Sequence, residues 1–300
     1  MTRSAVGVVS PTEAVNPRTA HIDEVPTAEL LRLINDEDRL VAGAVAAALP
    51  ELARLVEEAV RRVSAGGRVH YFGAGTSGRL AVVDAAELPP TFGVARGEVV
   101  VAHQAGGSGA VREAVEDAED DDDGADATAV AAADVVVGIA ASGRTPYVGA
   151  ALSAGRAVGA ATALVTSNPW PPLAAQADFV VVADTGPEAI TGSTRLKAGT
   201  AAKLVLHTFS TALMVRLGHT YGHFMVDMQE SNAKLRGRSL GMLVQATGES
   251  EQRCAEALDR CGDRKTALVH LLAHGASPDR CREALARAGG RVREALAALD

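Results

Sequence analysis

The stretch Val69–Arg79 reads VHYFGAGTSGR, a short apolar run followed by a loop rich in glycine and hydroxyl side chains. An apolar run without polar alternation predicts a strand that is buried on both faces. Four more such runs follow, at Val99–His103, Asp134–Ala140, Ala161–Thr166 and Phe179–Ala183. Helical patterns separate several of them, at Ser77–Leu88, Ser108–Glu119 and Pro146–Ala157. This alternation predicts a doubly wound α/β domain with a mainly parallel five-stranded sheet, whose ligand lies at the carboxyl ends of the strands.

Helical patterns also flank this domain on both sides. Before it, we expect one helix from Thr27, with Thr27 as a possible cap, and Ala-rich helices over Asp38–Val63 with an interruption near Pro50. After it, we expect a long helix over Arg195–Leu217 and a small helical bundle from Asn232 onward. The predicted division is an N-terminal segment with helices (1–50), the α/β domain (51–230) and a C-terminal helical domain (231–300).

Composition excludes several classes of function. The 300 residues hold 29 Lys and Arg against 37 Asp and Glu, a net charge of −8, and only 3% are aromatic, which argues against a nucleic-acid partner. We find neither a secretory signal nor an apolar run long enough to span a membrane, which favours a cytoplasmic protein with no membrane partner. Three cysteines (Cys254, Cys261 and Cys281) lack metal-like spacing and are expected to be reduced thiols.

The loop after the first strand matches the dinucleotide fingerprint G-x-G-x-x-G over Gly73–Gly78. Dinucleotide binding also requires an acidic residue at the end of the second strand, and that strand ends in His103 and Gln104. Thr76 and Ser77 instead place two hydroxyl groups at a helix N-terminus, where free N–H groups favour an anion. The sequence therefore favours a phosphate group over a dinucleotide.

Two more loops repeat this chemistry. Ala141–Pro146 reads ASGRTP and supplies the hydroxyls of Ser142 and Thr145, and Thr191–Arg195 reads TGSTR and opens the long helix. One such loop could simply cap its helix. Three loops that follow strands of one sheet predict a shared sugar-phosphate pocket instead.

A metal site is the alternative at His219, His223 and Asp227, whose four-residue spacing could place three ligands on one helix face. Gly218 and Gly222 weaken a helix there, so a turn is the simpler interpretation. We therefore predict no metal.

The motifs GAGTSGR, ASGRTPY and TGSTRLKAGTAAK resemble those of the sugar isomerase (SIS) domain family. Together with INDED, DAAELPPTFG and MVDMQESNAKL, they are similar to those of the N-acetylmuramic acid 6-phosphate etherases, over nearly the whole chain from about Thr12. The resemblance implies a homodimer, a sugar-phosphate substrate and no cofactor. It implies cleavage of the substrate's D-lactyl ether by elimination and then hydration, giving N-acetylglucosamine 6-phosphate and D-lactate.

The resemblance also implies two catalytic carboxyl groups. Glu87, in DAAELPP, is expected as the proton-donating acid and Glu119, in AVEDAED, as the base, although each could change role between the two steps. Pro89 and Pro90 are expected to end the helix just after Glu87. The substrate contacts are expected in the three loops, at Gly75, Thr76, Ser77, Gly78, Ser142, Gly143, Arg144, Thr145, Ser193 and Lys197.

Glu119 is harder to select than Glu87. Val111, Val115 and Glu119 share one face if the segment is a single helix, so Glu119 continues an apolar stripe. The spacing from Glu87 to Glu119 is about one residue longer than the resemblance predicts, so Glu116 stays open as the alternative.

Two other functions stay open. One is a non-catalytic sugar-phosphate sensor like the animal glucokinase regulator, a relative with the same fold, and the other is an aldose–ketose phosphate isomerase. A sensor needs no acid pair, so Glu87 and Glu119 argue against it. The DAAELPP motif and the helical tail favour an etherase over an isomerase.

Overall fold

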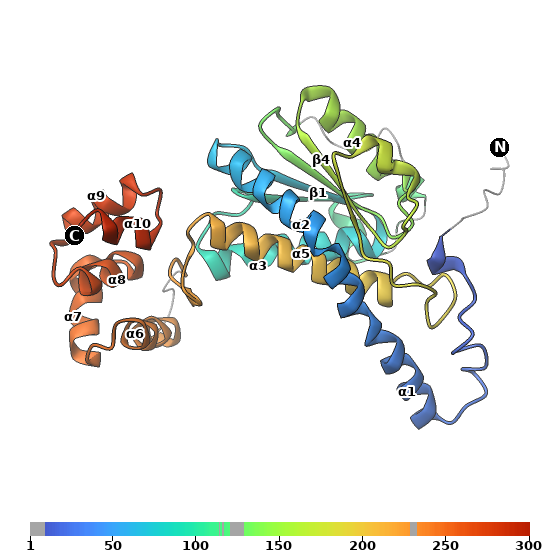
Figure 1. Ribbon diagram of the computed structural model, residues 1–300, viewed down its shortest axis with the longest axis horizontal. Coiled ribbons are helices and arrows are strands. Elements are labelled where there is room, and N and C mark those ends of the chain that lie inside the picture. Colours follow the sequence, from blue (N-terminus) through green and yellow to red (C-terminus); the bar gives the residue numbers. More distant parts are fainter. Residues whose placement is uncertain (1–9, 114, 116, 121–128, 229–232) are drawn as a thin grey trace. The chain divides into compact units, whose positions relative to one another are not determined.

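The computed structural model describes residues 10–113, 115, 117–120, 129–228 and 233–300. The chain forms two compact units, Met1–Ala86 with Arg96–Ser210 and Glu87–Ala95 with Thr211–Asp300. The first holds the sheet and the N-terminal helices, and the second holds the C-terminal helices (Figure 1). In the part of the chain that is described, no helix combines the length and the apolar character needed to cross a membrane.

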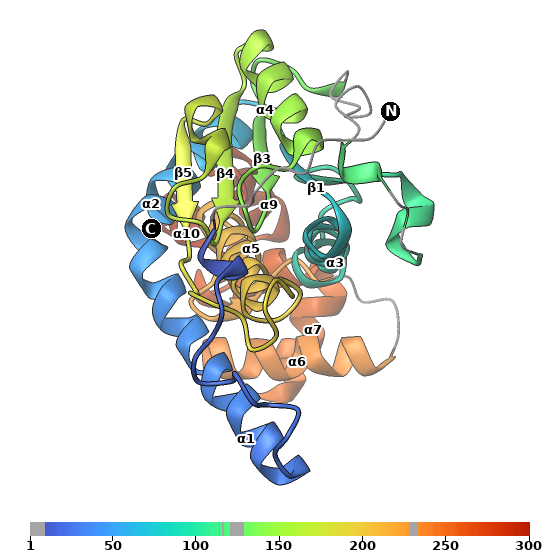
Figure 2. The ribbon, with the colours of Figure 1, turned by 90° about the vertical axis from the view of Figure 1, so that its right-hand side faces the viewer.

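The first unit is built on a parallel five-stranded sheet in the order β2-β1-β3-β4-β5 (Figure 2). The strands are β1 (Val69–Gly73), β2 (Val100–Gln104), β3 (Val135–Ile139), β4 (Ala161–Thr166) and β5 (Phe179–Val182). Every residue of β1, β3 and β4 is buried, which is why these runs lack polar alternation. The predicted sheet is confirmed, with each strand end within one residue of its expected position.

Helices cover both faces of this sheet. On one face, α4 (Pro146–Val158) packs over an apolar core that includes Phe72 and Leu152. On the other, the ring of Tyr71 lies 6.3 Å from that of Phe209 in α5 (Lys197–Arg216). Alternate residues of β1 therefore anchor the two helical layers.

The N-terminal helices are α1 (Thr27–Asp38) and α2 (Leu40–Ser64). Pro26 occupies the N-cap of α1, so the suggested Thr27 cap is wrong. The expected interruption of α2 near Pro50 is wrong as well, since the helix runs through Pro50. Buried apolar residues line one face of α2 both before and after Pro50, and this packing holds the helix together across the missing hydrogen bond.

The third helix, α3 (Gly75–Phe92), is longer than predicted. Pro89 and Pro90 lie inside it, so the expected stop just after Glu87 is wrong. The Thr91 hydroxyl donates to the Glu87 carbonyl at 2.7 Å, and the Gly93 N–H donates to the Pro89 carbonyl at 3.0 Å. These bonds complete the last turn although both prolines lack an N–H group.

The predicted helix over Ser108–Glu119 is also wrong. The segment forms two short 3₁₀ turns, η2 (Ser108–Val111) and η3 (Ala118–Asp120). Asp117 lies between them with φ 61°, a left-handed conformation that an α-helix cannot contain. Val111, Val115 and Glu119 therefore form no helical stripe.

The second unit contains a helical bundle, as predicted. Its helices are α6 (Ala233–Thr247), α7 (Glu251–Cys261), α8 (Arg264–Leu272), α9 (Pro278–Arg287) and α10 (Val292–Ala297). Their apolar residues form one core, and Ser250, Asp263 and Ser277 cap α7, α8 and α9 through side-chain oxygens. Cys254, Cys261 and Cys281 are buried in this unit and form no disulfide bond with one another.

A hairpin precedes this bundle, formed by β6 (Thr220–Tyr221) and β7 (Phe224–Met225). His219, His223 and Asp227 therefore do not share a helix face, and the alternative metal site loses its basis. His219 Nδ1 lies 2.8 Å from Asp227 Oδ2. Within the described residues, no group of three or more His, Cys, Asp or Glu is arranged to hold a metal ion.

Candidate active site

Hydroxyl groups gather at the carboxyl edge of the sheet in the first unit. Ser77, Thr166, Ser167 and Thr194 line one small cavity there, which we name the hydroxyl cavity. Its volume of about 10 Å³ admits roughly one water molecule. Thr166 and Ser167 were not predicted from the sequence, although polar residues at the end of a buried strand and directly after it were a usable signal.

The loop after β1 holds Thr76 and Ser77 at the start of α3 because its glycines allow close packing. A Cβ added to Gly78 would lie 2.4 Å from the Gly73 carbonyl oxygen, so only glycine fits there. The methyl group of Thr76 lies 3.4 Å from the position a Cβ would take on Gly199 in α5. Thr76 therefore packs against α5, and Ser77 from the first hydroxyl loop and Thr194 from the third line the hydroxyl cavity together.

The second hydroxyl loop, after β3, packs against the chain that follows β4. The carbonyl of Ser142 accepts a hydrogen bond from Asn168 Nδ2 at 2.9 Å. Thr145 occupies the N-cap of α4, but its hydroxyl makes no capping bond, so capping does not explain this side chain. Arg144 is half-buried in the same loop.

We predict that Gly143→Ala destabilises this loop. Gly143 has φ 67°, and a Cβ there would lie 2.3 Å from Pro171 Cβ, so the substitution adds backbone strain and a clash. Thermal unfolding should show a loss of about 2 kcal/mol or more. Gly109→Ala is the matched control, because a Cβ there meets nothing within 4 Å. Equal melting temperatures for the two variants would contradict the prediction.

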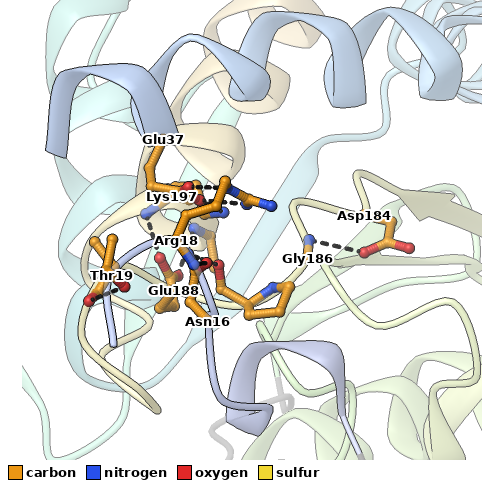
Figure 3. Close-up of polar contacts among 11 residues, drawn as sticks. Asn16, Arg18, Thr19, Glu37, Asp184, Gly186, Glu188 and Lys197 are labelled. Carbon is orange, nitrogen blue, oxygen red and sulfur yellow. Dashed lines mark hydrogen bonds and ion pairs between the residues drawn. The ribbon is translucent and has the colours of Figure 1, made fainter. Parts of the chain in front are cut away.

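Lys197 does not lie where the sequence analysis expected. Its side chain is fully buried, and Nζ donates to Glu37 Oε2 at 2.6 Å (Figure 3). Arg18 donates to the same carboxylate from Nε and Nη2, at 2.5 and 2.9 Å. The ammonium group of Lys197 thus pairs with Glu37 inside the protein. The prediction that Lys197 contacts the substrate is therefore wrong.

The N-terminus of α5 already carries an anion from the protein itself. Glu188 is fully buried, and its carboxylate accepts the backbone N–H groups of Lys197 and Ala198, both at 2.9 Å. This helix end is therefore filled, and only the loop's hydroxyl groups stay available to a ligand. Thr194 lines the hydroxyl cavity, whereas Ser193 is half-buried and is not among the lining residues.

We predict that Glu37 stabilises the fold above mildly acidic pH. Hydrogen bonds from Arg18 and then from Lys197 outweigh burial and lower the pKa of Glu37 from 4.5 to about 2. A carboxyl group with a lowered pKa stabilises the fold above its unfolded pKa, and this contribution disappears as pH falls from about 5 to 2. The difference in free energy of unfolding between the unmodified protein and Glu37→Gln should therefore shrink by about 3 kcal/mol over that range. A difference that does not change with pH would contradict this.

A second cavity, of about 170 Å³, lies beside the start of α3, and we name it the Glu119 cavity. Its lining includes Gly75 and Arg79 from α3, Gln104 from the end of β2, and Asp117 and Glu119 from the loop that follows. Glu119 is exposed, as an acid–base group open to substrate requires. The sequence analysis missed Arg79 and Gln104, although Arg79 directly follows the GAGTSG motif.

Known proteins resemble this chain over most of its length. The model of the glucokinase regulatory protein N-terminal SIS domain matches residues 51–156. The N-acetylmuramic acid 6-phosphate etherase of Thermobifida fusca (strain YX) is 58% identical over 88% of this chain and 88% of its own length. This chain belongs to the N-acetylmuramic acid 6-phosphate etherase family. The etherase of Symbiobacterium thermophilum is 51% identical over 87% of this chain and 88% of its own length.

Solved structures give a weaker likeness. A phosphoheptose isomerase from Francisella tularensis is 15% identical over 63% of this chain and 98% of that chain, with a TM-score of 0.47. A TM-score below 0.5 carries no weight for function.

The family's other expected acid, Glu87, lies on the C-terminal part of α3, where its side chain is exposed. Glu87 and Glu119 belong to different compact units. The catalytic role of each is therefore tested by its own substitution. The alternative acid, Glu116, lies outside the described residues.

Proposed function

We propose that this chain cleaves the D-lactyl ether of N-acetylmuramic acid 6-phosphate, giving N-acetylglucosamine 6-phosphate and D-lactate. One observation carries the proposal beyond the family relationship. The first turn of α3 lines both cavities, since Ser77 lines the hydroxyl cavity while Gly75 and Arg79 line the Glu119 cavity. One sugar phosphate could thus place its phosphate on hydroxyl donors and its reacting carbons beside an acid–base group.

The proposed reaction needs two proton-transfer groups. When the sugar ring is open, C1 is an aldehyde and the C2 proton is acidic. A base removes that proton, the bond between C3 and the ether oxygen breaks, and an acid protonates the leaving lactate. Water then adds its oxygen to C3 and a proton returns to C2. The net change is the addition of one water molecule without electron transfer, so the reaction itself calls for no redox cofactor.

We assign the base to Glu119 and the leaving-group acid to Glu87. Thr76, Ser77, Ser142 and Thr145 are the proposed phosphate or sugar contacts, together with the loop backbone at Gly75, Gly78, Gly143 and Arg144, and Ser193 is a weaker candidate. Neutral hydroxyl and N–H donors can hold a phosphate, so the net charge of −8 is no obstacle. We also propose a cytoplasmic homodimer that acts in the breakdown of cell-wall amino sugars, with no nucleic-acid partner.

The test is to incubate the purified protein with N-acetylmuramic acid 6-phosphate and to assay D-lactate. We expect lactate and N-acetylglucosamine 6-phosphate in equal amounts. Binding without lactate would support the sugar-phosphate sensor instead. Conversion of an aldose phosphate to a ketose phosphate, without lactate from the ether, would support the isomerase.

A further inference from the structure

The proposed substrate carries two anionic groups, which need different recognition. The 6-phosphate suits the hydroxyl cavity. The lactyl carboxylate lies only two bonds from the ether oxygen, so it must be bound close to the reacting carbons. The Glu119 cavity must therefore accept a carboxylate, although its own lining includes the acidic residues Asp117 and Glu119. A like charge placed there without a cation would be repelled.

Arg79 is the one basic residue among the described residues that line this cavity. It is half-buried on the first turns of α3. Its Nε donates to the Val111 carbonyl and its Nη2 to the Glu113 carbonyl, both at 3.1 Å. These two bonds fix the guanidinium plane beside the loop that leads to Glu119.

The guanidinium group keeps donors for a ligand. Arginine has five N–H groups, and the two carbonyl bonds of Arg79 use two of them. Among the described residues, we find no ion pair between Arg79 and an acidic side chain. A guanidinium held in a fixed plane matches the two oxygens of a carboxylate, and such pairs are stronger than neutral hydrogen bonds.

We propose that Arg79 binds the carboxylate of the lactyl group and so selects lactyl ethers over plain sugar phosphates. This inference rests on the proposed function, because it names the residue that recognises one part of that substrate. Arg79 thereby supplies the positive charge that a carboxylate needs beside Asp117 and Glu119 in the Glu119 cavity.

The test is a thermodynamic cycle between Arg79 and the carboxylate. The ligands are N-acetylmuramic acid 6-phosphate and its analogue with a carboxamide in place of the carboxylate. Binding is measured by calorimetry in a Glu87→Gln background, because Glu87 does not line the cavity and its loss should slow lactate formation by about two to four orders of magnitude. With Arg79 present, the acid should bind about ten- to one-hundred-fold more tightly than the amide. In Arg79→Met the ratio should fall to about one, and Arg79→Lys should lie between.

Two controls separate recognition from loop support. N-acetylglucosamine 6-phosphate lacks the carboxylate, so its affinity should change by less than about threefold in Arg79→Met. Arg112→Met removes an exposed cation of the same loop that does not line the cavity, and it should keep the full acid-to-amide ratio.

Two outcomes would overturn the proposal. One is an acid-to-amide ratio that Arg79→Met leaves unchanged. The other is an equal loss of affinity for all three ligands, which would show that Arg79 only holds the loop. The proposed function fails separately, through the absence of lactate from the unmodified protein. If that protein makes no lactate but keeps an Arg79-dependent preference for the acid, the reaction is rejected and the carboxylate site stands.

Discussion

Replacing Glu119 with Gln is expected to lower kcat for D-lactate formation by about two to four orders of magnitude, the usual contribution of a positioned acid–base group. The side chain is exposed, and it lines a cavity together with Gly75 and Gln104 at the carboxyl edge of the sheet. Glutamine keeps the size of the side chain but cannot accept the C2 proton. Affinity for N-acetylglucosamine 6-phosphate should therefore stay within a few fold.

Proton exchange distinguishes the role of Glu119 from that of Glu87. If Glu119 is the base, Glu119→Gln should lose both lactate formation and the exchange of the C2 proton with deuterated water. If Glu87 is the leaving-group acid, Glu87→Gln should lose lactate formation by a similar factor but keep that exchange. The opposite pattern would exchange the two assignments.

Asp120→Asn is the matched control for Glu119→Gln. Asp120 is the next residue in η3, it is exposed, and it does not line the Glu119 cavity. Its amide variant should keep full activity. Full activity in Glu119→Gln would contradict the prediction and would make Glu116→Gln the next variant to test.

The sheet was predictable because burial on both faces leaves a direct mark on the sequence. The run Val135–Ile139 reads VVVGI and is buried at every residue, and loops rich in glycine and polar residues separate most of the strands. The strand order, β2-β1-β3-β4-β5, is one of the common orders of doubly wound folds, and the sequence alone did not single it out. The first two hydroxyl loops were predictable for the same reason, since they follow β1 and β3, whose carboxyl ends share one edge of the sheet.

The segment that carries Glu119 was not predictable from periodicity. Its spacing fits a helix, but Gly106 and Asp117 adopt positive φ angles of 80° and 61°, and the chain turns instead. A Cβ on Gly106 would lie 3.2 Å from the Cβ atoms of Ala110, Val115 and Ala118, so this loop folds back on itself. Such packing depends on tertiary contacts, which a pattern of residue types does not record.

The ion-pair partner of Lys197 was likewise not predictable from the sequence. In the sequence it follows a hydroxyl loop, as a phosphate-binding lysine might be expected to do, but its partner Glu37 lies 160 residues away. Only the folded chain brings α1 to the start of α5. Substitutions in this buried ion pair are therefore expected to lower stability, and by different amounts for Glu37 and for Lys197.

Glu37→Gln is expected to destabilise the first unit by about 3–5 kcal/mol, and Lys197→Met by much less. The Lys197 side chain is fully buried, so removing Glu37 leaves its ammonium group in the interior without a direct ion pair, although the nearby Glu188 carboxylate still acts on it electrostatically. Removing Lys197 leaves Glu37 paired with Arg18, whose side chain is 55% exposed and can stay solvated. The two members of this ion pair should thus differ in cost because, within the described part of the chain, only Glu37 forms direct ion pairs with two partners.

Urea unfolding of the two single variants and of Glu37→Gln with Lys197→Met measures this asymmetry. The double variant should be more stable than Glu37→Gln alone, since it removes the unpaired ammonium group. Arg54→Gln is the control, because it breaks an ion pair with Glu51 in which the arginine is 65% exposed and should cost less than about 1 kcal/mol. A loss in Lys197→Met as large as that in Glu37→Gln would show that the lysine stabilises the fold mainly by packing, and that its charge at the start of α5 contributes little.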